Sequence, residues 1–213
     1  MTDPIKTLIA ALLDHSGSMT ASKLATEDGW RELIEEQRAN PGHCQVTLAQ
    51  FDSDYEVLYP PTDIAAVPEF TVEPAGMTAL LDAVGRFITE VGQQLSALPE
   101  GERPGQVICL IMTDGMENAS QQWDWDEVQR LITQQREVYG WEFIFLGANI
   151  DAVQVGQRMG VKAEFAMTYT GTDYTHNRAA YKTTSKLITD GRTGGCFTEL
   201  GFTDVDRKQA MGE

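Results

Sequence analysis

Hydrophobic positions along this chain follow two different periods. Short apolar runs typical of buried strands cover residues 6–13, 44–51, 55–59, 106–113, 141–148 and 164–169. Longer segments at 24–40, 78–98 and 125–140 repeat their apolar residues every three to four positions, which predicts amphipathic helices. Strands alternating with helices indicate an α/β fold. We therefore expect a doubly wound, mostly parallel sheet with helices on both faces.

The runs at 44–51 and 55–59 break this alternation. Only the residues Asp52, Ser53 and Asp54 separate them, which is too short a connection for the crossover that two parallel strands need. The two runs must therefore pair as an antiparallel hairpin. The expected sheet has six strands, with residues 55–59 forming one antiparallel edge strand.

Chain length and glycine placement predict the domain organisation. A chain of 213 residues with 42% hydrophobic content is long enough to bury one sizeable core. Gly191, Gly194 and Gly195 interrupt the last helical pattern near residue 190. We therefore expect one domain over residues 1–190 and a loosely attached, glycine-rich tail over residues 191–213, and we expect the core to stay folded when residues after about 195 are removed.

The charge balance limits the classes of partner. Sixteen Lys and Arg against thirty-two Asp and Glu give a formal net charge of −16, which repels nucleic acid and anionic membrane surfaces. No segment approaches the roughly 18 apolar residues of a membrane span, and the N-terminal segment lacks the basic region of a secretion signal. These features lead us to expect a cytoplasmic protein.

The cysteines give no sign of a zinc site. Cys44 and Cys109 lie inside apolar runs and are expected in the core, while Cys196 lies in the predicted tail. No CxxC pair or Cys/His spacing suited to zinc occurs in the sequence.

Small oxygen-bearing side chains follow the first predicted strand. The stretch LIAALLDHSGSMT places Asp14, Ser16 and Ser18 at alternate positions, so their side chains point the same way in an extended segment. Ligands of open parallel sheets bind beyond the carboxyl ends of the strands. Oxygen donors without nitrogen or sulfur suit a hard cation such as Mg²⁺.

Two later strand ends supply further oxygen atoms. Thr78 opens the helical segment 78–98, and Asp114 directly follows the apolar run 106–113. Each residue has an ordinary alternative role, because Thr is a good helix N-cap and Asp114-Gly115 is a common turn pair.

Taken together, DxSxS, the later Thr and the TDG segment resemble the von Willebrand factor A domain and its metal-ion-dependent adhesion site. The resemblance covers roughly residues 5–170 and implies a Rossmann-like fold. It implies a site for Mg²⁺, or for Mn²⁺ or Ca²⁺, with hydroxyl ligands and with carboxylates that bind the ion directly or through water. The implied ligands are Asp14, Ser16, Ser18, Thr78 and Asp114. Gly17, Gly76 and Gly115 would keep the loops tight beside the ion.

Longer segments are similar to a mainly bacterial and phage branch of that family. They are DHSGSM, QFDSDYEVLY, GMTALLDA, MTDGMENAS and GWEFIFLGAN. His15 lies where this branch varies, so we assign it no metal role.

Other chemistries lack residues that they require. Haloacid dehalogenase-type phosphatases need an acid where Ser16 stands, and a serine hydrolase needs a GxSxG motif. An EF-hand loop starting at Asp14 would need glycine and glutamate where Met19 and Ala25 stand. No general base accompanies the predicted metal ligands, so we predict a protein that is not an enzyme.

These observations favour a metal-dependent protein-binding module that holds an Asp or Glu carboxylate of a partner protein. The cation would bridge carboxylates that otherwise repel each other. Two alternatives remain open at this point. One is a structural subunit, for example of a phage particle, whose metal only braces the loops, and the other is a metal-dependent hydrolase.

Overall fold

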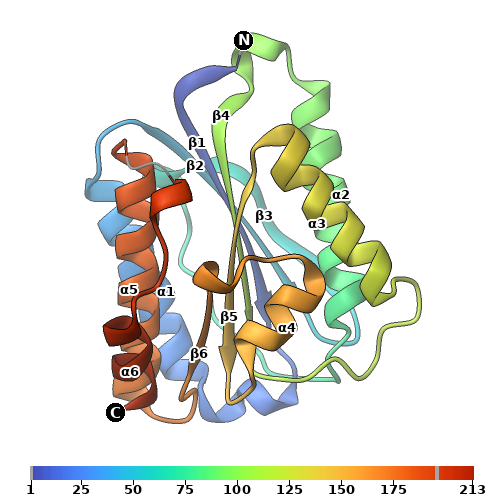
Figure 1. Cartoon of the computed structure of the whole chain (residues 1–213), viewed down its shortest axis with the longest axis vertical. Helices are drawn as coiled ribbons and strands as arrows, with labels where there is room; N and C mark the ends of the chain where they lie inside the picture. The colour runs from blue at the N-terminus through green and yellow to red at the C-terminus, as the bar shows by residue number, and fades with distance from the viewer. Residues whose placement is uncertain (1, 195–196) are drawn as a thin grey trace.

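The computed structural model describes residues 2–194 and 197–213, and its centre is one six-stranded sheet. The strands lie in the order β3-β2-β1-β4-β5-β6 (Figure 1). Their bounds are β1 Asp3–Asp14, β2 His43–Phe51, β3 Tyr55–Asp63, β4 Pro104–Thr113, β5 Glu142–Ala148 and β6 Ala166–Tyr169.

Strand pairing confirms the predicted fold class. β1 pairs in parallel with β2 and β4, and β4, β5 and β6 continue the parallel arrangement. Only β3 runs antiparallel, and it forms the edge beside β2. The short connection between β2 and β3 therefore sets the direction of this edge strand, as the sequence predicts.

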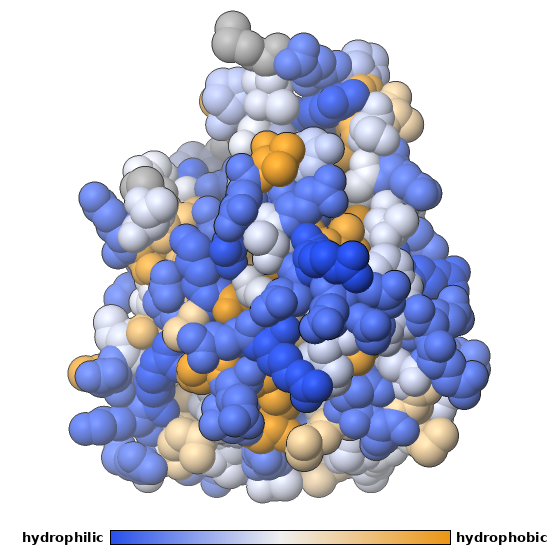
Figure 2. All heavy atoms as spheres, turned by 45° about the vertical axis from the view of Figure 1, so that its right-hand side comes forward, coloured by the Kyte–Doolittle hydropathy of each residue, from blue (hydrophilic) through white to orange (hydrophobic). Residues whose placement is uncertain are grey.

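Helices cover both faces of the sheet. Figure 1 shows α1 and α5 on one face and α2, α3 and α4 on the other. The helices are α1 Lys23–Ala39, α2 Leu80–Ala97, α3 Trp125–Tyr139, α4 Ala152–Met159, α5 Tyr174–Arg192 and α6 Asp204–Met211. In the described part of the chain, no helix combines the length and apolar character needed to cross a membrane. Figure 2, turned toward the α2–α3 side, shows a mainly hydrophilic surface with small separate apolar areas.

The core lies where the central strands are covered on both faces. Residues 8–13 of β1 and 107–112 of β4 are all buried, which explains their nearly continuous apolar sequences. Cys44 and Cys109 belong to this core, as expected. Burial raises the pKa of the Cys44 thiol to about 11, so this cysteine stays protonated at neutral pH. Cys196 lies outside the described residues.

The segment after α5 packs more closely than the sequence predicts. Helix α5 continues past residue 190 to Arg192, so the predicted domain boundary falls inside a helix. Phe197 and Phe202 are buried, and the Phe197 ring lies 5.8 Å from the Phe165 ring, centroid to centroid. The backbone N–H of Thr170 donates to the carbonyl of Ala210 in α6 at 3.0 Å.

Residues 197–211 therefore pack against the domain in the structure, and the effect of removing this segment stays a prediction. Helix α5 runs through Gly191 and ends at Arg192, and widely spaced apolar side chains then return the chain to the core. Such spacing gives no helical or strand period, so periodicity alone did not reveal this packing.

Candidate metal centre

The order of the strands brings two of the predicted ligands together. From β1 the chain crosses to β2 on one side, while β4 lies on the other side, so the connections change direction between β1 and β4. Asp14 is the last residue of β1, and Asp114 directly follows β4. Both carboxylates therefore lie at the carboxyl end of the sheet, at the switch point where ligands bind in open α/β folds. This end is the lower one in Figure 1.

Asp14 is fixed in place and fully buried. Its Oδ1 accepts a hydrogen bond from the backbone N–H of Ser16 at 2.7 Å, and its Oδ2 accepts one from the Thr113 hydroxyl at 2.5 Å. Within the described residues, no Lys, Arg or His forms an ion pair with Asp14 or Asp114. Burial raises the pKa of Asp14 because it penalises the charged form.

Two serine hydroxyls connect Asp14 with Asp114. Ser16 Oγ lies 3.0 Å from Ser18 Oγ, and the Ser18 hydroxyl donates to Asp114 Oδ1 at 2.6 Å. Burial, and then the nearby charge of Asp14, raise the pKa of Asp114 to about 6, although the hydrogen bond from Ser18 opposes this shift. Ser16, Ser18, Asp14 and Asp114 therefore form one cluster that concentrates negative charge.

Thr78 does not cap the helix that it precedes. Helix α2 begins at Leu80 and its N-cap residue is Ala79, whose side chain makes no capping hydrogen bond. The Thr78 hydroxyl forms no hydrogen bond with any residue in the described ranges, and although the whole residue is only 3% exposed, this oxygen is not among the fully buried polar atoms that lack a partner. A Cβ placed on Gly115 would lie 2.6 Å from Thr78 Oγ1, so this hydroxyl lies directly beside the Asp114 loop.

Residues 117–120 provide the hydrogen bonds that the start of α2 needs. Glu117 Oε2 accepts from the backbone N–H of Leu81 at 2.9 Å, and Ser120 Oγ accepts from that of Asp82 at 3.0 Å. Asn118 Oδ1 accepts from the Thr78 N–H at 2.9 Å, while the Asn118 N–H donates to the Thr78 carbonyl at 3.0 Å. These contacts hold the Thr78 and Asp114 loops against each other. The sequence pattern of the MENAS segment, residues 116–120, did not predict this role.

The contacts continue along the same connection toward α3. The Asp82 carboxylate accepts from the backbone N–H groups of residues 121, 122 and 123, each at 2.8 Å. The Trp123 ring lies over Gly85 of α2, where any Cβ would collide with it. Trp125 stacks under the Arg158 guanidinium, 4.0 Å from the ring centroid. Both tryptophans thus pack against the domain, in agreement with the preference of Trp for burial.

The loop before Thr78 is fastened to the DxSxS loop. The N–H of Gly17 donates to the carbonyl of Gly76 at 3.3 Å, and the N–H of Ala75 donates to the carbonyl of His15 at 2.9 Å. His15 Nδ1 lies 3.1 Å from the carbonyl oxygen of Glu73, so the imidazole makes a local contact. Gly76 has a φ of +64°, a conformation that favours glycine.

Comparisons with known proteins find matches by structure but not by sequence. A scan against protein-family models finds no match, and a search of curated proteins finds none. Among solved structures, the von Willebrand factor type A protein of Catenulispora acidiphila matches with a TM-score of 0.61 and 13% identity. That match covers 86% of this chain and 43% of the other. This chain has a von Willebrand factor A (vWA) fold.

Two further solved structures share this fold. The mussel byssus proximal thread matrix protein 1, solved with a zinc-occupied MIDAS motif, matches with a TM-score of 0.60 and 16% identity over 86% of this chain and 46% of that one. The type V pili tip protein Mfa5 of Porphyromonas gingivalis matches with a TM-score of 0.61 and 10% identity over 91% and 98%. The chain spans less than half the length of the mussel protein, and these low identities show the fold alone.

The side chains that the vWA fold gathers suit a hard divalent cation. All donors in the cluster are oxygen atoms, and within the described ranges no Lys, Arg or His forms an ion pair with either carboxylate, although His15 opposes the effect of burial on the pKa of Asp14. Among the described residues, no group of three or more His, Cys, Asp or Glu side chains comes together, so the cluster differs from a typical zinc site. Two carboxylates with three hydroxyls instead fit an ion that keeps several waters.

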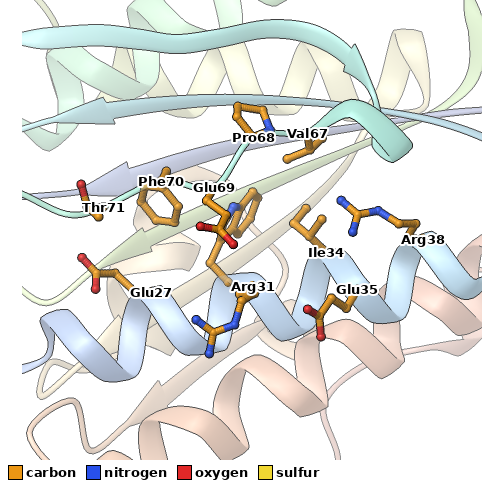
Figure 3. Close-up of a pocket in the computed structure, with 11 residues that line it drawn as sticks. Glu27, Arg31, Ile34, Glu35, Arg38, Val67, Pro68, Glu69, Phe70 and Thr71 are labelled. Atoms are coloured by element: carbon orange, nitrogen blue, oxygen red, sulfur yellow. The ribbon is translucent and has the colours of Figure 1, made fainter.

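A separate groove of about 320 Å³ lies between α1 and residues 67–71. Figure 3 shows Arg31 and Glu35 of α1 on one side and Pro68 and Phe70 on the other. The Phe70 ring meets the Trp30 ring edge to face, with centroids 6.1 Å apart. None of the five predicted ligands lines this groove, and its charged side chains are of both signs.

Proposed function

We propose that this chain holds a divalent cation, preferably Mg²⁺, at the carboxyl end of its sheet and uses it to bind a carboxylate of a partner protein. Asp14, Ser16, Ser18, Thr78 and Asp114 would hold the ion. When bound, the cation would supply an electrophilic position that a partner's Asp or Glu can occupy.

The Thr78 hydroxyl is the observation that carries this proposal. This hydroxyl has no partner among the described residues, and its oxygen keeps access to solvent beside the Asp114 loop, so its lone pairs are available to a cation. Its ordinary role as a helix cap is not used, because Glu117 and Ser120 satisfy the start of α2. The charges of Asp14 and Asp114, which no ion pair among the described residues neutralises, support the same conclusion, because a cation between them would remove their repulsion.

A binding role agrees with the side chains around the cluster better than catalysis does. Glu117 is already an acceptor for the N–H groups of Leu81, Ala119 and Ser120, so it is not free to act as a general base. His15 is engaged with the carbonyl of Glu73. The matching structures also include a pilus adhesin, SpaC of Lactobacillus rhamnosus GG. The cytoplasmic location and the bacterial or phage origin stay sequence-based predictions.

Calorimetric titration with Mg²⁺ tests the proposed ligands directly. Thr78→Ser keeps a hydroxyl and should keep Mg²⁺ binding, whereas Thr78→Asn changes the donor and should lose much of it. Asp114→Ala should lose it as well. The proposal is refuted if wild type and all three variants bind Mg²⁺ equally, or if none binds Mg²⁺ or Mn²⁺ at millimolar concentration.

A partner-binding assay separates adhesion from a purely structural metal. A pull-down from the native host, with and without chelator, should show a partner that is lost on chelation and in Asp14→Ala. A folded Asp14→Ala protein that retains its partners would favour the structural role. Magnesium-dependent turnover of phosphoesters would favour the hydrolase.

A further inference from the structure

Two exposed methionines lie beside the proposed ligands. Met77 directly precedes Thr78, and Met116 follows Asp114 by two positions. Their side chains are 57% and 68% exposed. Single exposed apolar residues are normal on protein surfaces and carry no conclusion alone. These two differ because each belongs to a loop that supplies a metal ligand.

The structure brings these two loops into contact. Gly115, the neighbour of Met116, lies against the hydroxyl of Thr78, the neighbour of Met77. The reciprocal hydrogen bonds between Thr78 and Asn118 hold the loops in this position. Consecutive Cα atoms are about 3.8 Å apart, so both methionines begin within a few ångströms of this contact. They form an apolar rim on the two loops that supply Thr78 and Asp114.

We propose that this methionine rim selects the residues that flank the partner's carboxylate. The proposal rests on the function proposed above and names the class of partner: a protein segment with a single Asp or Glu and large apolar side chains within about two residues of it. Methionine is flexible and polarisable, so the rim fits a range of apolar side chains instead of one sequence.

The negative charge of this protein favours a partner segment with one acid and apolar neighbours over a segment with several acids. The chain carries a net charge of −16, and Lys23, which contacts the loop before Thr78, is already paired with Glu73 at 3.3 Å. One carboxylate can be held by the cation, but each additional acid on the segment would face this negative charge without compensation. Apolar neighbours avoid the repulsion and bury surface against Met77 and Met116.

Peptide titrations test the rim. In an extended peptide, residues two positions apart share a face, so capped GLGEGLG places both leucines on the side of the glutamate. Capped GGGEGGG and GLGQGLG are the matched probes. Binding in excess Mg²⁺ is followed by NMR of methionine methyl groups. Wild type should bind GLGEGLG about 3- to 10-fold more tightly than GGGEGGG, given the apolar area available.

Variants assign the preference to the two methionines. Met77→Ser combined with Met116→Ser should abolish the preference for GLGEGLG while leaving Mg²⁺ affinity and GGGEGGG binding unchanged. The double variant Met77→Leu with Met116→Leu should retain the preference for GLGEGLG. Ile5→Ser is the control, because Ile5 is 71% exposed near the start of β1, at the opposite end of that strand from Asp14.

The possible failures are distinguishable. Equal affinity of wild type for the leucine and glycine peptides overturns the rim and leaves the metal-dependent function standing. A preference that persists in the double serine variant also overturns the rim. Three other results overturn the proposed function and the rim with it. The first is equal binding of GLGEGLG and GLGQGLG, and the second is binding that chelator does not affect. The third is no binding of either glutamate peptide at millimolar concentration.

Discussion

Replacing Asp114 with Asn should stabilise the metal-free protein while it removes metal binding. Asn keeps an oxygen that can accept the Ser18 hydrogen bond but removes the charge that faces Asp14. Sites that hold a cation between carboxylates are strained by repulsion when the cation is removed. Burial and repulsion from Asp14 both penalise the Asp114 charge, so its removal should stabilise the metal-free protein.

The pKa of Asp114 sets the size of this effect. A pKa raised from 3.8 to about 6 corresponds to about 3 kcal/mol at about 1.36 kcal/mol per pH unit. Asp114 is partly exposed, so solvent screening reduces the expected gain to about 1–2 kcal/mol. For a chain of this length the corresponding rise in Tm is about 2–8 °C.

The sign of the pH dependence follows from the same shift. A carboxyl whose pKa is higher in the folded than in the unfolded chain binds more protons when folded. Its contribution to stability is therefore complete below about pH 4 and is lost as the pH rises through about 6. Asp114→Asn should raise Tm at pH 7.5 in chelator, and the difference from wild type should shrink toward pH 4.5.

Differential scanning calorimetry in EDTA measures both effects. Asp126→Asn is the matched control, because Asp126 is an exposed acid in the first turn of α3 and should give no gain. Adding Mg²⁺ should raise the Tm of wild type and leave that of Asp114→Asn unchanged. A lower Tm for Asp114→Asn in EDTA, or a gain independent of pH, would refute the proposed repulsion.

Two further predictions concern residues that the structure brought to attention. Asn118→Ala should weaken Mg²⁺ binding about 10-fold or more by freeing the Thr78 amide, whereas Asn118→Asp, which keeps an acceptor oxygen, should lose less; titration calorimetry compares them. Removing residues 195–213 should cost about 3–6 kcal/mol through loss of the buried Phe197 and Phe202, lowering Tm by about 10 °C. An unchanged Tm would support the expectation of a loosely attached tail.

The strands could be predicted because they depend on local pattern, whereas the five ligands were implied by the family resemblance and stay a prediction. A buried parallel strand is an apolar run, and the DxSxS loop begins where such a run ends at Asp14. The role of Thr78 could not be settled locally. A threonine before a helix is ordinarily a cap, and the contacts that displace it from that role come from Glu117 and Ser120, about forty residues further along the chain.

The packing of the C-terminal segment could not be predicted from local pattern at all. Helix α6 is short and mostly polar, so its sequence carries little hydrophobic periodicity. It is held by the buried Ala210 and by Arg207, whose guanidinium donates to the carbonyl of Ala163 at 2.9 Å. Attachments of this kind depend on one or two side chains meeting a distant strand end, and no window of sequence contains both partners.

The way in which α2 begins affects how binding would be controlled. A helix N-terminus usually attracts anions through its unpaired N–H groups, and it could hold a carboxylate without any metal. Here Glu117 already occupies the N–H of Leu81, and the Ser120 hydroxyl accepts from the next one. Without a cation, an approaching acid would meet only the charges of Asp14 and Asp114. Availability of the divalent ion would thus act as an on–off control of adhesion, with no weaker metal-free mode beneath it.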